Sequence, residues 1–318
     1  MKTRMTTYRR RLLGRQGPIT RSWRRCVRMR ALDSGDLLQA RHTSRSMPFD
    51  MLTTQAAVCS ADAYVEPVKD GSTLISDAMT DAQAVVTFGS EDDAVPSATV
   101  AFRGSSSRAD WYTNLWFPLK PLPSPHRRGV KAHAGFLRQY LAVHAHIQLE
   151  LERGGVQHVV LTGHSLGGAL AVIAAAMLPS KYTYDVVTFG APRAGNEELS
   201  SAAYHKCKSA IRVVHDRDVV PCVPLQTMGF RHVCEPWVLL DADGNTEVKD
   251  KQLSFWQQCA LRARGLFERD YGIRDHFMSK YMRGVPQDEV REERRRELEM
   301  QSFPMDSVEA LPSTSTER

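Results

Sequence analysis

The sequence predicts an α/β fold in which a mostly parallel central sheet is covered by helices on both faces. Its apolar segments are short and β-branched, and they are continuous rather than alternating, as in buried parallel strands. Helical segments separate them along the chain, which favours right-handed strand–helix–strand units. The 318 residues are 42% hydrophobic and 25% charged, which excludes a mainly disordered chain. The five candidate strands are residues 84–88, 98–102, 158–162, 185–189 and 211–214.

Two helices and one hairpin are predicted between and after these strands. Apolar residues recur at helical spacing from Phe136 to Leu151, and Gly154-Gly155 can end that helix. A second helix, residues 166–178, is apolar almost all round and should be deeply buried. The pair Asp243-Gly244 between two apolar runs predicts a hairpin turn.

Composition divides the chain into a basic leader with a linker (residues 1–50), a central domain (residues 51–284) and a charged tail (residues 285–318). The net charge is +6, but residues 1–32 hold Lys2, ten arginines and no acid, so the remainder is mildly acidic. This leader resembles an organelle transit peptide and lacks the apolar core of a secretory signal. With no apolar run near the ~20 residues of a spanning helix, we expect a cytoplasmic or organellar protein. The leader has no nucleic-acid motif, and no nucleic-acid or protein partner is expected.

Six cysteines are present, and no Cys-x-x-Cys pair suggests zinc, so no metal is expected. The redox state of Cys222 and Cys234 is left open.

The stretch Gly163-His164-Ser165-Leu166-Gly167 is the most informative segment. It follows an apolar strand and opens a helix, which is the context that a nucleophilic serine requires. Such a serine stands on a sharp turn, and glycines two residues to either side remove side chains that would collide. The backbone N–H of Leu166, at the helix N-terminus, can stabilise an oxyanion.

A serine of this kind needs a histidine oriented by a carboxylate, and in this fold the chain order is serine, acid, histidine. The carboxylate should follow the strand at residues 211–214, where Asp216 and Asp218 both qualify. His276 and His232 are the candidate histidines, and the position of His276 before a last helix favours it.

Five segments resemble class 3 lipases, the family of fungal triacylglycerol lipases, in the order expected of that family. They are residues 100–111, His133-Ala134-Gly135-Phe136, residues 163–170, residues 188–196, and residues 212–221 with Asp275-His276. The resemblance implies an α/β-hydrolase fold and a Ser165–His276–Asp218 triad, and it favours Asp218 over Asp216. It also implies an oxyanion role for Ser105 beside Leu166, and a lid that contains Arg108, Trp111 and Leu115.

The resemblance implies a serine ester hydrolase, most simply a lipase that cleaves acylglycerols through an acyl-enzyme without a cofactor. A phospholipase or soluble carboxylesterase of the same fold is the alternative. A non-catalytic lipid-binding protein that retains the fold is the second alternative. The substrate is expected to be a lipid or another ester, met at a membrane or lipid-droplet surface that the basic leader can contact.

Overall fold

The structure is a computed structural model that describes residues 49–69, 71–90, 94–104, 118–123, 129–216, 218–234, 237–249 and 274–286. The strands are β1 (Ser72–Asp77), β2 (Ala82–Phe88), β3 (Ser97–Phe102), β4 (Leu119–Pro121), β5 (Lys131–His133), β6 (His158–His164), β7 (Thr183–Phe189), β8 (Cys207–His215), β9 (Trp237–Leu240) and β10 (Thr246–Lys249). The α-helices are α3 (Met51–Asp62), α5 (Ala134–Arg153), α6 (Leu166–Met177), α7 (Glu197–Lys206) and α9 (Met278–Tyr281), with short 3-10 turns at Val220–Cys222, Gln226–Met228, Arg274–His276 and Met282–Gly284.

The central sheet has eight strands in the order β1-β2-β3-β6-β7-β8-β9-β10. Strands β3, β6, β7, β8 and β9 run parallel, whereas β1 and β2 on one side and β10 on the other pair antiparallel. The antiparallel pairs are joined by short connections, and only a longer crossover can join parallel neighbours. The carboxyl ends of the five parallel strands therefore meet at one edge of the sheet.

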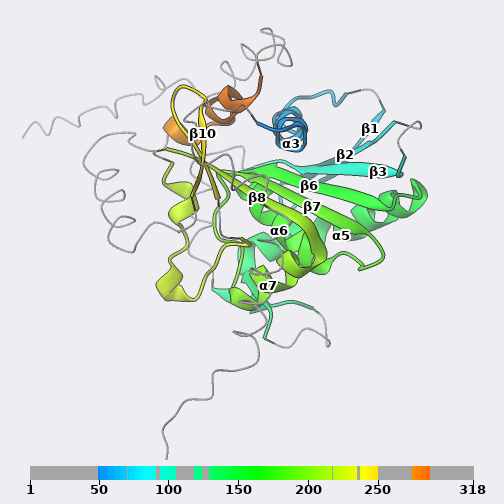
Figure 1. The fold of residues 1–318 in the computed structure, drawn as a ribbon. Coiled ribbons are helices and arrows are strands. Elements are labelled where there is room, and N and C mark those ends of the chain that lie inside the picture. The colour runs from blue at the N-terminus through cyan, green and yellow to red at the C-terminus, as the bar shows by residue number, and fades with distance from the viewer. Residues whose placement is uncertain are drawn as a thin grey trace, which may run out of the picture. The chain divides into compact units, whose positions relative to one another are not determined.

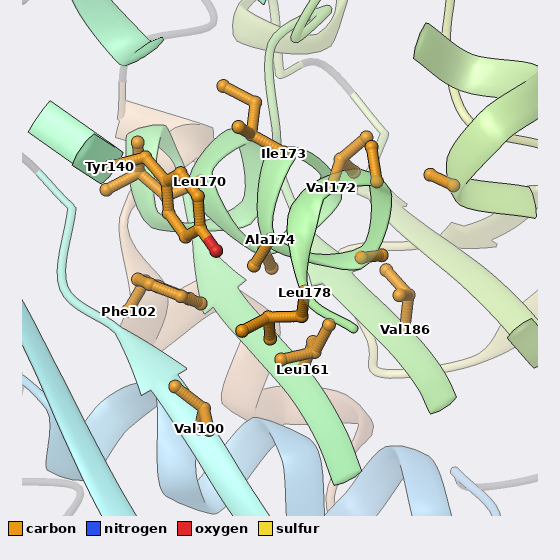
Figure 2. Close-up of a cluster of buried hydrophobic side chains, with 14 of the residues drawn as sticks. Val100, Phe102, Tyr140, Leu161, Leu170, Val172, Ile173, Ala174, Leu178 and Val186 are labelled. Atoms are coloured by element: carbon orange, nitrogen blue, oxygen red, sulfur yellow. The ribbon is translucent and has the colours of Figure 1, made fainter. Parts of the chain in front are cut away.

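Helices cover both faces of this sheet (Figure 1), with α3 on one side and α5, α6 and α7 on the other. The two faces have separate hydrophobic cores. Successive residues of β7 point to opposite faces, so Val186 belongs to one buried cluster and Val187 to the other. Helix α6 is the most buried, with every residue from Leu166 to Ala176 inside the protein. Figure 2 shows its side chains packed between Tyr140 of α5 and the strand residues Val100, Leu161 and Val186.

The second face holds a smaller core around α3 and α9. Phe49, Phe189 and Tyr281 pack there, and the backbone N–H of Phe49 donates to the carbonyl of Gly284. This contact brings the two ends of the described region together. Tyr281 of α9 packs against Phe189 at the end of β7, and its hydroxyl accepts from the backbone N–H of His215 at the end of β8.

The predicted α/β-hydrolase architecture is confirmed, including the five strands, both helices and the hairpin β9–β10. Helix α3 and strand β1 were not predicted, because α3 has almost no amphipathic pattern and β1 is a polar edge strand. Among the described helices, none combines the length and apolarity needed to cross a membrane.

Candidate active site

Ser165 occupies a strained turn between β6 and α6. Its φ of 57° and ψ of −128° lie in a region that L-residues rarely adopt. The turn depends on its glycines, since a Cβ on Gly163 would lie 2.4 Å from the carbonyl carbon of Gly167. A Cβ on Gly167 would lie 2.0 Å from the carbonyl oxygen of Phe102. The predicted glycine spacing is thus explained by close backbone contacts on both sides of the serine.

Three side chains converge on this turn. The His276 Nε2 lies 2.7 Å from the Ser165 Oγ, and its Nδ1 lies 2.7 Å from the Asp218 Oδ2. Ser165 follows β6, Asp218 lies shortly after β8, and His276 precedes α9, so all three reach the carboxyl edge of the sheet. Because the Asp218 carboxylate can only accept when ionised, His276 donates from Nδ1 and its Nε2 accepts the serine hydrogen.

The Asp218 carboxylate is buried and fully hydrogen-bonded. Its side chain is 0% exposed, whereas that of His276 is 15% exposed. The backbone N–H of Val220 donates to Oδ1 at 2.8 Å, and the Tyr281 hydroxyl donates to Oδ2. The Tyr281 oxygen in turn accepts from the backbone N–H of His215. Burial, followed by the Asp218 charge, raises the pKa of Tyr281 well above its ordinary value, so it stays a donor.

Gly190, at the end of β7, allows this close packing. Its φ is +58°, and a Cβ there would lie 2.7 Å from the Asp218 Oδ2, 2.8 Å from the Tyr281 Oη and 3.1 Å from the His276 Nδ1. A side chain at this position would therefore push directly on the acid–histidine pair.

The oxyanion side of the site is described in part. Leu166 begins α6, so its backbone N–H belongs to the first turn, whose N–H groups have no partner within the helix. Gly104 follows β3 and packs against the nucleophile turn, with a Cβ position only 3.3 Å from the Ser165 Cβ. The predicted oxyanion residue Ser105 lies outside the described residues, as do the predicted lid residues Arg108, Trp111 and Leu115.

The structure places the alternative candidate residues differently from Asp218 and His276. His232 is buried and its Nε2 lies 2.8 Å from the Pro221 carbonyl, so it serves the packing of a loop. Asp216 is exposed, and the carboxylate that contacts His276 is that of Asp218. Cys222 and Cys234 are both buried thiols. Within the described ranges, no group of histidine, cysteine or acidic side chains is arranged to hold a metal ion.

Tyr64, His164 and Tyr281 surround the three residues and were not predicted. His164 is visible within the glycine–serine pentad, but its neighbours Tyr64 and Tyr281 come from segments with no recognisable motif. Burial, then the nearby His276, holds the pKa of His164 well below its ordinary value. His164 is therefore a neutral imidazole beside the site.

The fold has the α/β-hydrolase architecture, and the arrangement of Ser165, His276 and Asp218 has the geometry of a Ser-His-Asp triad. Residues 99–228 match the family model described as "Lipase (class 3)". Relatives agree: a "Secreted mono- and diacylglycerol lipase 1" of Fusarium solani is 30% identical over 206 residues, and a "Lipase" of Rhizomucor miehei is 32% identical over 198. These alignments cover 63% and 59% of this chain, and 60% and 52% of the relatives, less than two thirds of each. The match to residues 99–228 and these relatives agree with the resemblance to class 3 lipases that the sequence motifs carry.

Solved structures of lipases share this fold. One, described by the statement that a serine protease triad forms the catalytic centre of a triacylglycerol lipase, has a TM-score of 0.54 at 26% identity, over 71% of this chain and 91% of that chain. A fungal lipase–inhibitor complex has a TM-score of 0.55 at 25% identity, over 74% of this chain and 95% of that one.

The expected cytoplasmic or organellar location is wrong by this comparison, because the Fusarium solani relative is named as secreted. The expectation relied on the lack of an apolar core in residues 1–32, and such an absence does not determine a compartment.

Proposed function

We propose that this protein is a carboxylic ester hydrolase that cleaves acylglycerols through an acyl-enzyme. The observation that carries the proposal is the unbroken hydrogen-bonded chain from the Ser165 Oγ through His276 to Asp218, with 2.7 Å at each step. The names of the relatives support a lipid ester as the substrate class.

The mechanism follows from the roles that these positions allow. The Ser165 Oγ attacks the ester carbonyl carbon while the His276 Nε2 takes its proton. The tetrahedral oxyanion is held by the backbone N–H groups of Leu166 and Ser105, with the Ser105 hydroxyl as a further donor, each worth about 3–4 kcal/mol. His276 then protonates the leaving alcohol, and the acyl-enzyme forms as the carbon–oxygen bond breaks. Asp218 orients His276 and stabilises the imidazolium.

Water then hydrolyses the acyl-enzyme. In this step water is the nucleophile and the Ser165 oxygen is the leaving group. His276 takes a proton from water, the hydroxide attacks the acyl carbon, and the Ser165 Oγ leaves with the proton returned by His276. Every proton in this cycle moves through a group of the chain or through substrate.

A fluorophosphonate probe tests the assignment of the nucleophile. Labelling is expected in the wild type and in Ser200→Ala, which removes a serine of α7 away from the turn, and it should vanish in Ser165→Ala. A folded wild type that is not labelled would identify the non-catalytic lipid-binding alternative. A series of esters from acetate to oleate, with a phospholipid included, would then separate a lipase from a carboxylesterase or a phospholipase.

We propose that residues 51–284 form the catalytic domain and that residues 106–117 form its lid. The apolar residues of a lid can exchange protein contacts for lipid contacts at an interface. The expected result is a rise in rate when a long-chain ester exceeds its solubility. A smooth saturation curve through that point would reject the lid.

We further propose that the basic leader, residues 1–32, assists contact with an anionic lipid surface. Each arginine near such a surface is worth about 1 kcal/mol. Removal of these residues should weaken binding to anionic liposomes at low salt, and unchanged binding would reject this role.

A further inference from the structure

A line of hydrogen bonds crosses the site beneath the catalytic side chains. The backbone N of Gly104 lies 3.1 Å from the Tyr64 Oη, which lies 3.0 Å from the His164 Nδ1. The His164 Nε2 lies 2.5 Å from the backbone carbonyl oxygen of His276. The line therefore connects the end of β3, one residue before Ser105, to the main chain of the histidine that contacts Ser165.

The chemistry of the four groups allows one direction of donation. The carbonyl oxygen of His276 can only accept, so the His164 Nε2 must carry a hydrogen. A neutral His164 then accepts at Nδ1, and the donor to it is the Tyr64 hydroxyl. The Tyr64 oxygen keeps a lone pair that accepts from the Gly104 N–H. All of these donors and acceptors are used without conflict.

The neutral state of His164 has a further consequence for the reaction. Its ring centroid lies 4.7 Å from that of His276, at an interplanar angle of 32°. His276 becomes an imidazolium in each transition state, and a second cation at this distance would oppose that charge. Burial keeps the pKa of His164 well below its ordinary value, and burial raises that of Tyr64, so neither member of the line carries charge.

His276 has little local structure to hold it. It ends a three-residue 3-10 turn, Arg274–His276, and the following Phe277 is extended. A hydrogen bond to its carbonyl from a side chain fixed in the nucleophile turn sets the main chain of the base relative to Ser165. Misplacement of a catalytic group by about 1 Å can cost 10²-fold in rate.

We propose that Tyr64 and His164 are positioning residues. They hold the main chain of His276 and the end of β3 at Gly104 in fixed positions relative to Ser165. The inference rests on the proposed function, because it assigns these two side chains to the same hydrolytic site. Their side chains bond to the main chain of His276 and Gly104 rather than to the Ser165 hydroxyl. Their effect on the reaction therefore acts through the positions of His276 and of the end of β3.

Two substitutions of His164 separate positioning from simple packing. Glutamine is long enough for its amide to donate from the place of Nε2, whereas the shorter asparagine reaches only the place of Nδ1. We expect kcat for a soluble ester to fall about tenfold in His164→Asn with KM unchanged. The fall in His164→Gln should be only several-fold, because this variant keeps the donor to the His276 carbonyl and loses only the acceptor for the Tyr64 hydroxyl. Tyr64→Phe, which removes the donor to Nδ1, should also lower kcat several-fold at unchanged KM.

The melting temperature of each variant provides the control for packing. Because Asn and Gln both replace the same buried ring, we expect similar melting temperatures for the two variants. Equal kcat in His164→Asn and His164→Gln, or a wild-type kcat in His164→Asn, would overturn the inference. The downfield proton resonance of the His276–Asp218 hydrogen bond gives a readout without turnover. It should persist in His164→Gln and be lost or broadened in His164→Asn, and its persistence in both would overturn the inference. A wild type that neither labels nor hydrolyses esters would reject the proposed function, and this resonance would still decide the positioning role.

Discussion

Replacement of Gly190 by alanine should reduce turnover as well as stability, and the loss of turnover should be specific to this position. Gly190 has a φ of +58°, and the added Cβ would meet the Asp218 carboxylate oxygen, the Tyr281 hydroxyl and the His276 ring at 2.7, 2.8 and 3.1 Å. Ordinary contact of a Cβ begins at about 3.4 Å, so the acid and the histidine must move by several tenths of an ångström. These atoms form the hydrogen bonds from His276 and Tyr281 to the Asp218 carboxylate.

The two effects of the substitution have different sizes. The left-handed backbone costs a non-glycine residue roughly 1–2 kcal/mol of stability. Displacement of a catalytic group by an appreciable part of 1 Å costs up to about 10²-fold in rate. We therefore expect kcat to fall by about 10²-fold, while the free energy of unfolding falls by a few kcal/mol at most.

Gly155 provides a control with the same backbone strain. Its φ is +59°, but a Cβ there would meet nothing within 4 Å. Gly155→Ala should lose about the same 1–2 kcal/mol of stability in urea unfolding and keep the wild-type kcat on a soluble ester. Two results would refute this reasoning: both variants keep kcat within about twofold of wild type, or both lose it equally. In either case, close contact of a side chain at position 190 with Asp218 and His276 does not determine kcat.

Three further outcomes follow from the same contacts. Tyr281→Phe removes a donor from the buried Asp218 carboxylate and should lower kcat about tenfold at unchanged KM; Tyr184→Phe, which removes a buried hydroxyl at the opposite edge of the sheet, should not. Burial holds the pKa of His232 well below 6.5, so the unfolded chain takes up a proton before the folded one as pH falls. His232 alone should therefore lower stability by about 1.4 kcal/mol per pH unit below pH 6.5, and His232→Gln should reduce the slope of unfolding free energy against pH by that amount; an unchanged slope refutes this. Gly163→Ala, whose Cβ would lie 2.4 Å from backbone, should yield little soluble folded protein, and a wild-type melting temperature would contradict the turn geometry.

The local features of this protein could be predicted from short stretches of sequence. The turn at Ser165 depends on glycines two residues away on either side, and the following helix depends on a run of small apolar residues. Both depend on neighbours along the chain, so a pattern of a few residues is sufficient to predict them. The resemblance to class 3 lipases added the preference for Asp218 over Asp216, and it agreed with the choice of His276 that its position had favoured.

The assembly of the site was decided by tertiary structure. His276 lies 111 positions from Ser165, and Tyr64 lies 100 positions from His164. Contacts at such separations depend on the order of the strands, on the helix that follows each one and on the packing of α3 and α9. Nothing in the sequence marks Tyr64 or Tyr281, because an ordinary tyrosine becomes part of a site only when the fold brings it there. Gly190 lies in the segment 188–196 that resembles class 3 lipases, but its approach to Asp218 is visible only in the structure.

The sequence by itself therefore determined the α/β class and the strained serine turn, since each is dictated by covalent neighbours and hydrophobic periodicity. Only the tertiary structure decided which distant hydroxyls, amides and imidazoles hold the base in place. A hydrogen bond requires placement to a few tenths of an ångström, and packing of the whole sheet provides that accuracy.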